Sequence, residues 1–179
     1  MAIRTVLTYP DPRLRVAAEP VDAFDDELIA LAADLRDTLC TTPGIALSAP
    51  QLGVARQLVL IDLSESGQAP EYYVNPRILA RSAWGFVSES CLSVPGVTAS
   101  VLRATRLRVS ASDLSNVPFE RDVDGLRAVC LQHEIDHLAG KLFVERLGFL
   151  RRLLWQATAG RRARRGLNER PSLVESTSR

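Results

Sequence analysis

One run, Leu131-Gln132-His133-Glu134-Ile135-Asp136-His137-Leu138, decides the fold of this chain. His133 and His137 lie four residues apart, so on a helix both imidazoles project from one face and can bind the same metal ion. Glu134 lies at the edge of that face, where its carboxylate can reach a metal-held water without being a ligand. These are the only two histidines in the sequence. The run therefore predicts a metal site built on a helix.

The sequence around the run indicates that this helix is buried. Residues 126–138 are apolar almost all round, which is typical of a helix inside a core, and Gly140 follows as a helix-ending residue. The pattern His-Glu-x-x-His also arises by chance, in helices whose histidines are only packed or exposed. Polar side chains on a buried helix need partners, however, and a metal ion supplies them. This context favours the metal site.

The composition limits the classes of protein to which this chain can belong. With 179 residues, 46% hydrophobic residues, 24% charged residues and a net charge of +1, we expect one globular domain. No run is long and apolar enough to cross a membrane, and the N-terminus lacks the apolar stretch of a signal peptide, which predicts the cytoplasm. The three cysteines are too few and too widely spaced for a disulfide framework, so a cysteine near the helix is a candidate ligand.

Apolar patterning predicts the other elements. Asp25 or Asp26 can cap a helix that runs to about Cys40, and residues 57–63 read as a strand buried on both faces. Four short strands are expected, at 72–75, 85–88, 107–112 and 118–123. A last helix, residues 149–159, is expected to pack outside the body.

The charge is concentrated at the C-terminus. Residues 161–179 hold six Arg and two Glu, a local net charge of +4, and leave −3 for the rest of the chain. We predict a catalytic domain over residues 1–160 and a basic, disordered tail over 161–179. Such a tail suits an anionic partner such as the ribosome, or is only a solvated terminus. We expect neither DNA nor a membrane as a partner.

A catalytic metal site usually has three protein ligands, so a third is needed. Downstream of the helix the acidic residues are Glu145, close to the helix end, and Glu169 and Glu175 in the tail. Upstream, Cys91 lies in a polar turn, residues 89–95. Its thiolate would complete a Cys-His-His set.

At this point the sequence resembles the peptide deformylases, metallohydrolases that remove the N-formyl group from nascent bacterial proteins. Three motifs appear in the family's order: Gly44-Ile45-Ala46-Leu47-Ser48-Ala49-Pro50-Gln51, Glu89-Ser90-Cys91-Leu92-Ser93, and Gln132-His133-Glu134-Ile135-Asp136-His137. Flanking pieces at 7–14, 74–76 and 140–143 match as well. The resemblance covers roughly residues 3–155 and implies an α+β fold, a mostly antiparallel sheet wrapped around the metal-binding helix.

The resemblance implies a role for each residue of the centre. Cys91, His133 and His137 would hold one divalent metal ion, and Glu134 would be the general base that takes a proton from water and passes it to the leaving amine. Gln51 and the backbone N–H of Leu92 would form the oxyanion hole. The expected metal is Fe(II), and Zn, Ni or Co are alternatives that the spacing cannot distinguish.

The resemblance also implies secondary roles. Glu89 and Arg103 match a buried ion pair behind the cysteine, although both could be surface charges. Asp136 can orient the metal helix or serve a neighbouring turn. Five residues match the pocket for the methionine side chain of the substrate or the strip beside the substrate backbone, although any of them could be ordinary core: Ile45, Ala46, Val87, Leu126 and Val129.

Four residues depart from the family pattern. Ala46 and Ser90 replace glycines, which is costly only where the backbone adopts a conformation open to glycine alone. Ser48 replaces the usual alanine, and Thr98 stands where many relatives have an arginine. None of these changes removes a ligand, the base or an oxyanion donor.

Three functions therefore stay open. The first is hydrolysis of N-terminal formyl-methionine with release of formate. The second is action on another N-formyl compound, and the third is a catalytically weak protein that binds ribosomes through its basic end. A generic zinc protease fits less well, because a convincing downstream ligand is missing.

Overall fold

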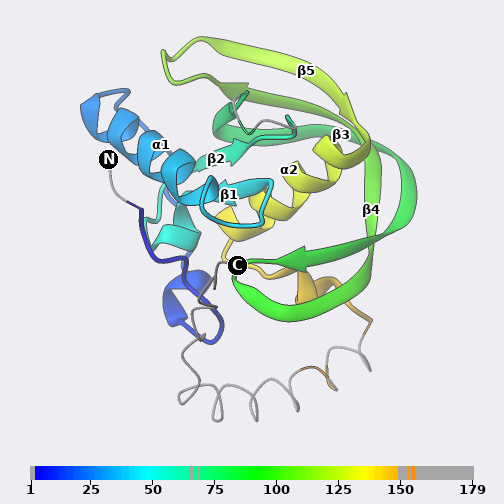
Figure 1. Ribbon diagram of the computed structural model, residues 1–179. Helices are drawn as coiled ribbons and strands as arrows, with labels where there is room; N and C mark the ends of the chain where they lie inside the picture. Colours follow the sequence, from blue (N-terminus) through cyan, green and yellow to red (C-terminus); the bar gives the residue numbers. More distant parts are fainter. Residues whose placement is uncertain (1–2, 65–66, 68, 149–152, 154, 156–179) are drawn as a thin grey trace, which may run out of the picture.

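The computed structural model describes residues 3–64, 67, 69–148, 153 and 155, and helix α2 (Gly125–Leu138) lies at its centre. A five-stranded antiparallel sheet curves around this helix in the order β1-β2-β3-β4-β5 (Figure 1). The strands are β1 (Ala46–Ser48), β2 (Leu58–Ile61), β3 (Glu71–Cys91), β4 (Val94–Ser112) and β5 (Pro118–Asp124). This arrangement confirms the expected α+β fold with its sheet around the buried helix.

Strands β3 and β4 form one long hairpin that sweeps round α2, and here the sequence-based prediction was wrong. The separate short strands expected at 72–75, 85–88 and 107–112 are parts of these two continuous strands. Most of the residues in the middle of β3, such as Arg81 and Ser82, are exposed, so they show no alternation of apolar and polar residues. Pairing with β4 extends the strand there, because backbone hydrogen bonds need no apolar pattern. The strand predicted at 118–123 is confirmed as β5.

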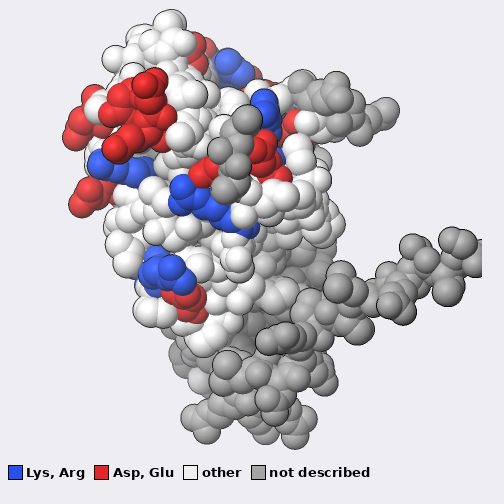
Figure 2. Space-filling view, turned by 60° about the vertical axis from the view of Figure 1, so that its left-hand side comes forward, with Lys and Arg blue, Asp and Glu red and all other residues white. Residues whose placement is uncertain are grey.

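Helix α1 (Asp26–Leu39) packs on one face of strand β2, where the two elements form a hydrophobic cluster, and both were predicted. The side chain of Asp25 caps the helix by accepting hydrogen bonds from the backbone N–H groups of Glu27 and Leu28, each at 3.1 Å. Leu35, in the apolar stripe of α1, and all four residues of β2 are fully buried. On the side turned forward in Figure 2, acidic and basic side chains lie in small mixed groups.

The N-terminal arm lies against the C-terminal end of α2. The backbone N–H of Ala18 donates to the carbonyl oxygen of Leu138 at 2.8 Å. Gly140, just beyond the helix, has φ of +67°, and a Cβ there would lie 2.5 Å from the carbonyl oxygen of Arg15. Glycine is therefore required at this position both by the backbone conformation and by the close approach of the arm.

Most of the predicted final helix, 149–159, and all of the predicted tail, 161–179, lie outside the described residues. Leu153 and Trp155 are described, and both are helical. The indole of Trp155 is buried against the ring of Tyr9, with 4.9 Å between ring centroids. None of the described helices is long and apolar enough to span a membrane.

Candidate metal centre and active site

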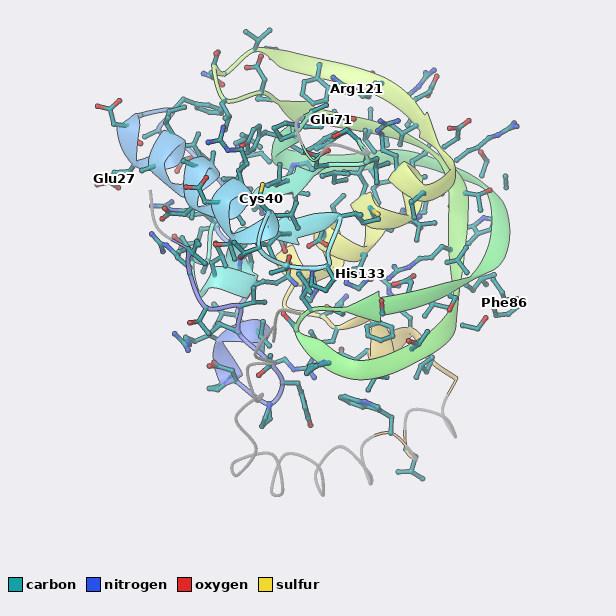
Figure 3. All side chains as sticks on the ribbon, in the orientation of Figure 1. Glu27, Cys40, Glu71, Phe86, Arg121 and His133 are labelled. Atoms are coloured by element: carbon teal, nitrogen blue, oxygen red, sulfur yellow. The ribbon has the colours of Figure 1, made fainter. Side chains whose placement is uncertain are left out.

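Two elements bring together the three side chains that are candidate metal ligands. Cys91 is the last residue of β3 and pairs with Val94, so it lies at the tip of the β3–β4 hairpin. His133 and His137 extend from α2, and His133 is labelled in Figure 3. The ligating atoms of the three residues lie within 4.8 Å of one another, and the Sγ of Cys91 is 3.2 Å from Nε2 of His137. The three side chains predicted as ligands therefore converge on one point.

The donor set suits a divalent transition metal. One sulfur and two imidazole nitrogens are ligands typical of zinc and of ferrous iron, and three protein ligands leave a position open for substrate. Nδ1 of His133 is held by Oε2 of Glu89 at 2.8 Å, which leaves Nε2 to face the metal. A carboxylate on the far nitrogen of a histidine is the usual support for a metal ligand. The residues present thus fit the metal that the sequence predicts.

When no metal is bound, the pKa values of the two histidines are shifted in opposite directions. Burial lowers the pKa of His133, but hydrogen bonds with Cys91 and Glu89 outweigh this effect and raise the pKa to about 10. Burial lowers the pKa of His137 well below its ordinary value, and the nearby charge of His133 lowers it further. A divalent cation held by these residues would compete with a proton for His133.

A buried polar chain lies behind the ligands. The guanidinium of Arg103 donates to both oxygens of Glu89, at 2.6 and 3.0 Å, and to Oδ2 of Asp136 at 2.7 Å. Arg146 donates to both oxygens of the Asp136 carboxylate. Burial alone raises the pKa of Glu89, but its hydrogen bonds with His133 and Arg103 lower the pKa to about 2. The structure thus brings together the three residues predicted to support the site.

Glu134 and Gln51 lie next to the ligands and are almost fully buried. Burial raises the pKa of Glu134, although the charge of His133 and a hydrogen bond from Ser48 oppose the shift. The amide nitrogen of Gln51, in the short 3₁₀ helix η2 (Ala49–Leu52), lies 3.8 Å from the Sγ of Cys91 and 3.2 Å from the hydroxyl of Ser93. A carboxylate and an amide N–H donor therefore face the position where a metal would bind.

A cavity of about 600 Å³ opens onto this centre. Ile45, Ala46, Leu126 and Val129 line it, as do Leu92, Cys91, His133, Glu134 and Gln51. Val87, the other predicted pocket residue, pairs with Val101 across the hairpin and is not among the lining residues. Cys130, which the sequence places next to the pocket as a packed thiol, also lines the cavity. Sequence reasoning gave no role to the hydroxyls of Ser48 and Ser93. No pattern in the sequence marks a buried hydroxyl as part of a site.

Ala46 and Ser90, which replace two glycines of the family pattern, carry no backbone strain. Among the described residues other than glycine, φ is positive at Asn75, Ala83 and Asn116 alone, so Ala46 and Ser90 adopt conformations that any residue allows. Ser90 is paired with Thr98 across the hairpin, and both are exposed. Ala46 and Ser90 therefore change side chains at the cavity and need no backbone conformation that is reserved for glycine.

A candidate metal site with a buried carboxylate, an amide donor and an open cavity is typical of a metal-dependent hydrolase. Comparisons with known proteins narrow the class. The model of the Polypeptide deformylase family matches residues 3–152. A peptide deformylase of Alkalilimnicola ehrlichii is 48% identical over 153 residues, which is 85% of this chain and 86% of that protein.

Solved structures agree with the sequence comparisons. A peptide deformylase from Legionella pneumophila superposes with a TM-score of 0.85 at 41% identity, over 94% of this chain and 100% of that one. A peptide deformylase from Synechococcus elongatus in complex with actinonin gives a TM-score of 0.82 at 37% identity, over 88% of each chain. The chain therefore belongs to the peptide deformylase family, metal-dependent hydrolases that act on N-formyl peptides.

Proposed function

We propose that Cys91, His133 and His137 hold one divalent metal ion, and that Glu134, Gln51 and Leu92 act beside it on formyl-methionyl peptides. One observation carries the proposal: the three ligating atoms meet within 4.8 Å, and Cys91 and His133 line a cavity that Glu134 and Gln51 also line. The first of the three functions inferred from the sequence is thus favoured. Action on another N-formyl compound and a purely ribosome-binding role are not favoured, because the similar proteins are peptide deformylases.

The chemistry follows from the side chains around the centre. A bound divalent metal supplies Lewis-acid chemistry, which makes water acidic enough to lose a proton near neutral pH. Glu134 accepts that proton and delivers it to the nitrogen of the methionine as the bond to the formyl carbon breaks. The amide of Gln51 and the backbone N–H of Leu92 donate to the oxygen that becomes negative during attack. The products are formate and a peptide with a free amino group.

Strand β1 offers a place for the peptide backbone, because it is the edge strand of the sheet. The N–H of Asp62 donates to the carbonyl oxygen of Ile45 at 2.9 Å, so these two residues form a hydrogen-bonded pair. In an antiparallel ladder such pairs alternate, so the N–H and C=O of Ala46 point away from β2 to the free edge. We infer that an extended substrate pairs there, with its methionine side chain against Ile45, Leu126 and Val129.

Formate release tests the proposal directly. We expect metal-loaded protein to release formate from a formyl-Met-Ala-Ser peptide and to release no acetate from the acetylated analogue. Cys91→Ala, compared at equal protein concentration, is expected to bind less than a tenth of the metal and to lose activity in proportion. Full activity in Cys91→Ala would contradict the ligand assignment, and a metal-loaded wild type without formate release would contradict the activity.

The identity of the metal and the cellular partner are further parts of the proposal. We propose Fe(II) as the metal, which elemental analysis of protein purified without oxygen tests against zinc, nickel and cobalt.

We propose that the basic residues 161–179 bind the ribosome in the cytoplasm, since they carry a net charge of +4. Cosedimentation of the full chain and of residues 1–160 with ribosomes measures this contribution, and equal binding would contradict it.

A further inference from the structure

The hydroxyl of Ser48 lies between the two side chains that the proposed mechanism uses. Ser48 ends β1 and is fully buried. Its Oγ is 2.7 Å from Oε2 of Glu134 and 3.0 Å from Oε1 of Gln51, while its backbone N–H donates to the same Oε1 at 2.9 Å. One residue thus contacts both the proposed base and the proposed oxyanion donor.

These contacts fix the direction of each hydrogen bond. A hydroxyl carries one hydrogen, so Ser48 can donate to only one of its two acceptors at a time. The carboxylate is charged and nearer, and Oε1 of Gln51 already accepts from the backbone N–H, so the hydroxyl donates to Glu134. Because Oε1 of Gln51 faces Ser48, its NH₂ group must point the opposite way, towards Cys91 and Ser93.

We propose that Ser48 is a positioning residue that sets Glu134 and Gln51 relative to each other. Its hydroxyl occupies one oxygen of the carboxylate and holds the side chain in one orientation, which leaves the other oxygen to accept the proton of water. Its backbone N–H orients the amide of Gln51 with the donor facing the substrate. This inference rests on the proposed roles of Glu134 and Gln51, and it adds a residue that only this local geometry reveals.

Removing the hydroxyl tests the inference. We expect Ser48→Ala to lower kcat about tenfold with less than a twofold change in KM, because one charged hydrogen bond to the base is lost while the cavity is kept. Ser48→Thr restores a hydroxyl and is expected to recover at least half of the lost kcat. Thr38→Val is the control, since it removes another buried hydroxyl, one on α1 whose hydrogen-bond partner is the backbone N–H of Arg4, and is expected to leave kcat unchanged.

A double-mutant cycle distinguishes positioning from packing. If Ser48 acts through Glu134, the Ser48→Ala change should lower kcat by less than twofold in a Glu134→Ala background. Equal losses in both backgrounds, or a loss explained by reduced metal content, would overturn the inference. An unchanged kcat in Ser48→Ala would also overturn it. The proposed function fails separately, if the wild type releases no formate or if Glu134→Ala retains full activity.

Discussion

Arg103 is the residue on which the polar layer behind the ligands depends. Its side chain is 3% exposed and contacts Glu89 and Asp136, which are nearly as deeply buried. Arg103→Ala removes the buried guanidinium partner of two buried carboxylates, so we expect a loss of about 3–5 kcal/mol in the free energy of unfolding. Urea unfolding of the metal-free protein measures this value.

An exposed arginine on the same strand is the matched control for this prediction. Arg108 pairs with Asp122 between β4 and β5, and both side chains are largely exposed. Arg108→Ala is expected to unfold close to the wild type, because exposed ion pairs contribute little. Equal midpoints for the two variants would show that the buried network does not stabilise the fold.

Cys130 and Cys40 are expected to differ sharply in reactivity. Burial, together with the charge of Glu134, raises the pKa of the Cys130 thiol to about 12, whereas Cys40 is exposed at the end of α1. Alkylation needs the thiolate, so at pH 8 we expect folded, metal-loaded protein to react rapidly at Cys40 alone. Mass spectrometry locates the label, and Cys40→Ser should abolish the rapid phase. Rapid labelling of Cys130 would contradict its burial.

At the scale of an element, the end of α2 depends on Gly140. Gly140→Ala forces a positive φ on a residue with a Cβ and places that carbon against the backbone of Arg15. We expect a loss of about 2–4 kcal/mol in stability, from backbone strain and from the overlap. Gly125→Ala, at the start of the same helix, also has positive φ but meets nothing within 4 Å. For Gly125→Ala we expect a loss of about 1 kcal/mol in the free energy of unfolding, which comes from backbone strain alone. Equal losses in the two variants would contradict the close approach of Arg15 to Gly140.

Tyr73 on β3 makes the fold sensitive to alkali. Its ring is buried against Phe119 of β5, and its hydroxyl donates to Glu71 at 2.8 Å. Burial and this hydrogen bond raise the pKa of Tyr73 to about 12, above the ordinary value near 10. The unfolded chain therefore loses the proton first, so this contribution to stability is complete below pH 10 and is lost as the pH rises to 12.

The replacement Tyr73→Phe tests the alkaline effect. Between pH 10 and 12 the free energy of unfolding should fall less steeply in the variant than in the wild type, by the contribution of one proton. Urea unfolding at a series of pH values measures both slopes. Parallel curves would show that Tyr73 titrates as an ordinary exposed tyrosine.

At the scale of the whole molecule, the parts predictable from sequence were those with a local pattern. The spacing of His133 and His137, the capping Asp25 and the apolar β2 each depend on nearby residues, so α1, α2 and β2 were predicted. The length of β3 and β4 depends on pairing between residues distant in sequence, which exposed residues such as Arg81 do not reveal. The contacts of Ser48 likewise depend on α2 packing against β1, because Glu134 and Ser48 are 86 positions apart in the sequence.

The central claim is that Glu134 transfers the proton while three other residues hold the metal. The most direct measurement is kcat for formate release from a formyl-methionyl peptide by the wild type and Glu134→Gln, at equal metal content per chain. We predict equal metal content and a kcat lower by about 1,000-fold in the variant, because the amide cannot accept the proton. A variant that keeps its metal and hydrolyses the peptide at the wild-type rate would contradict the account.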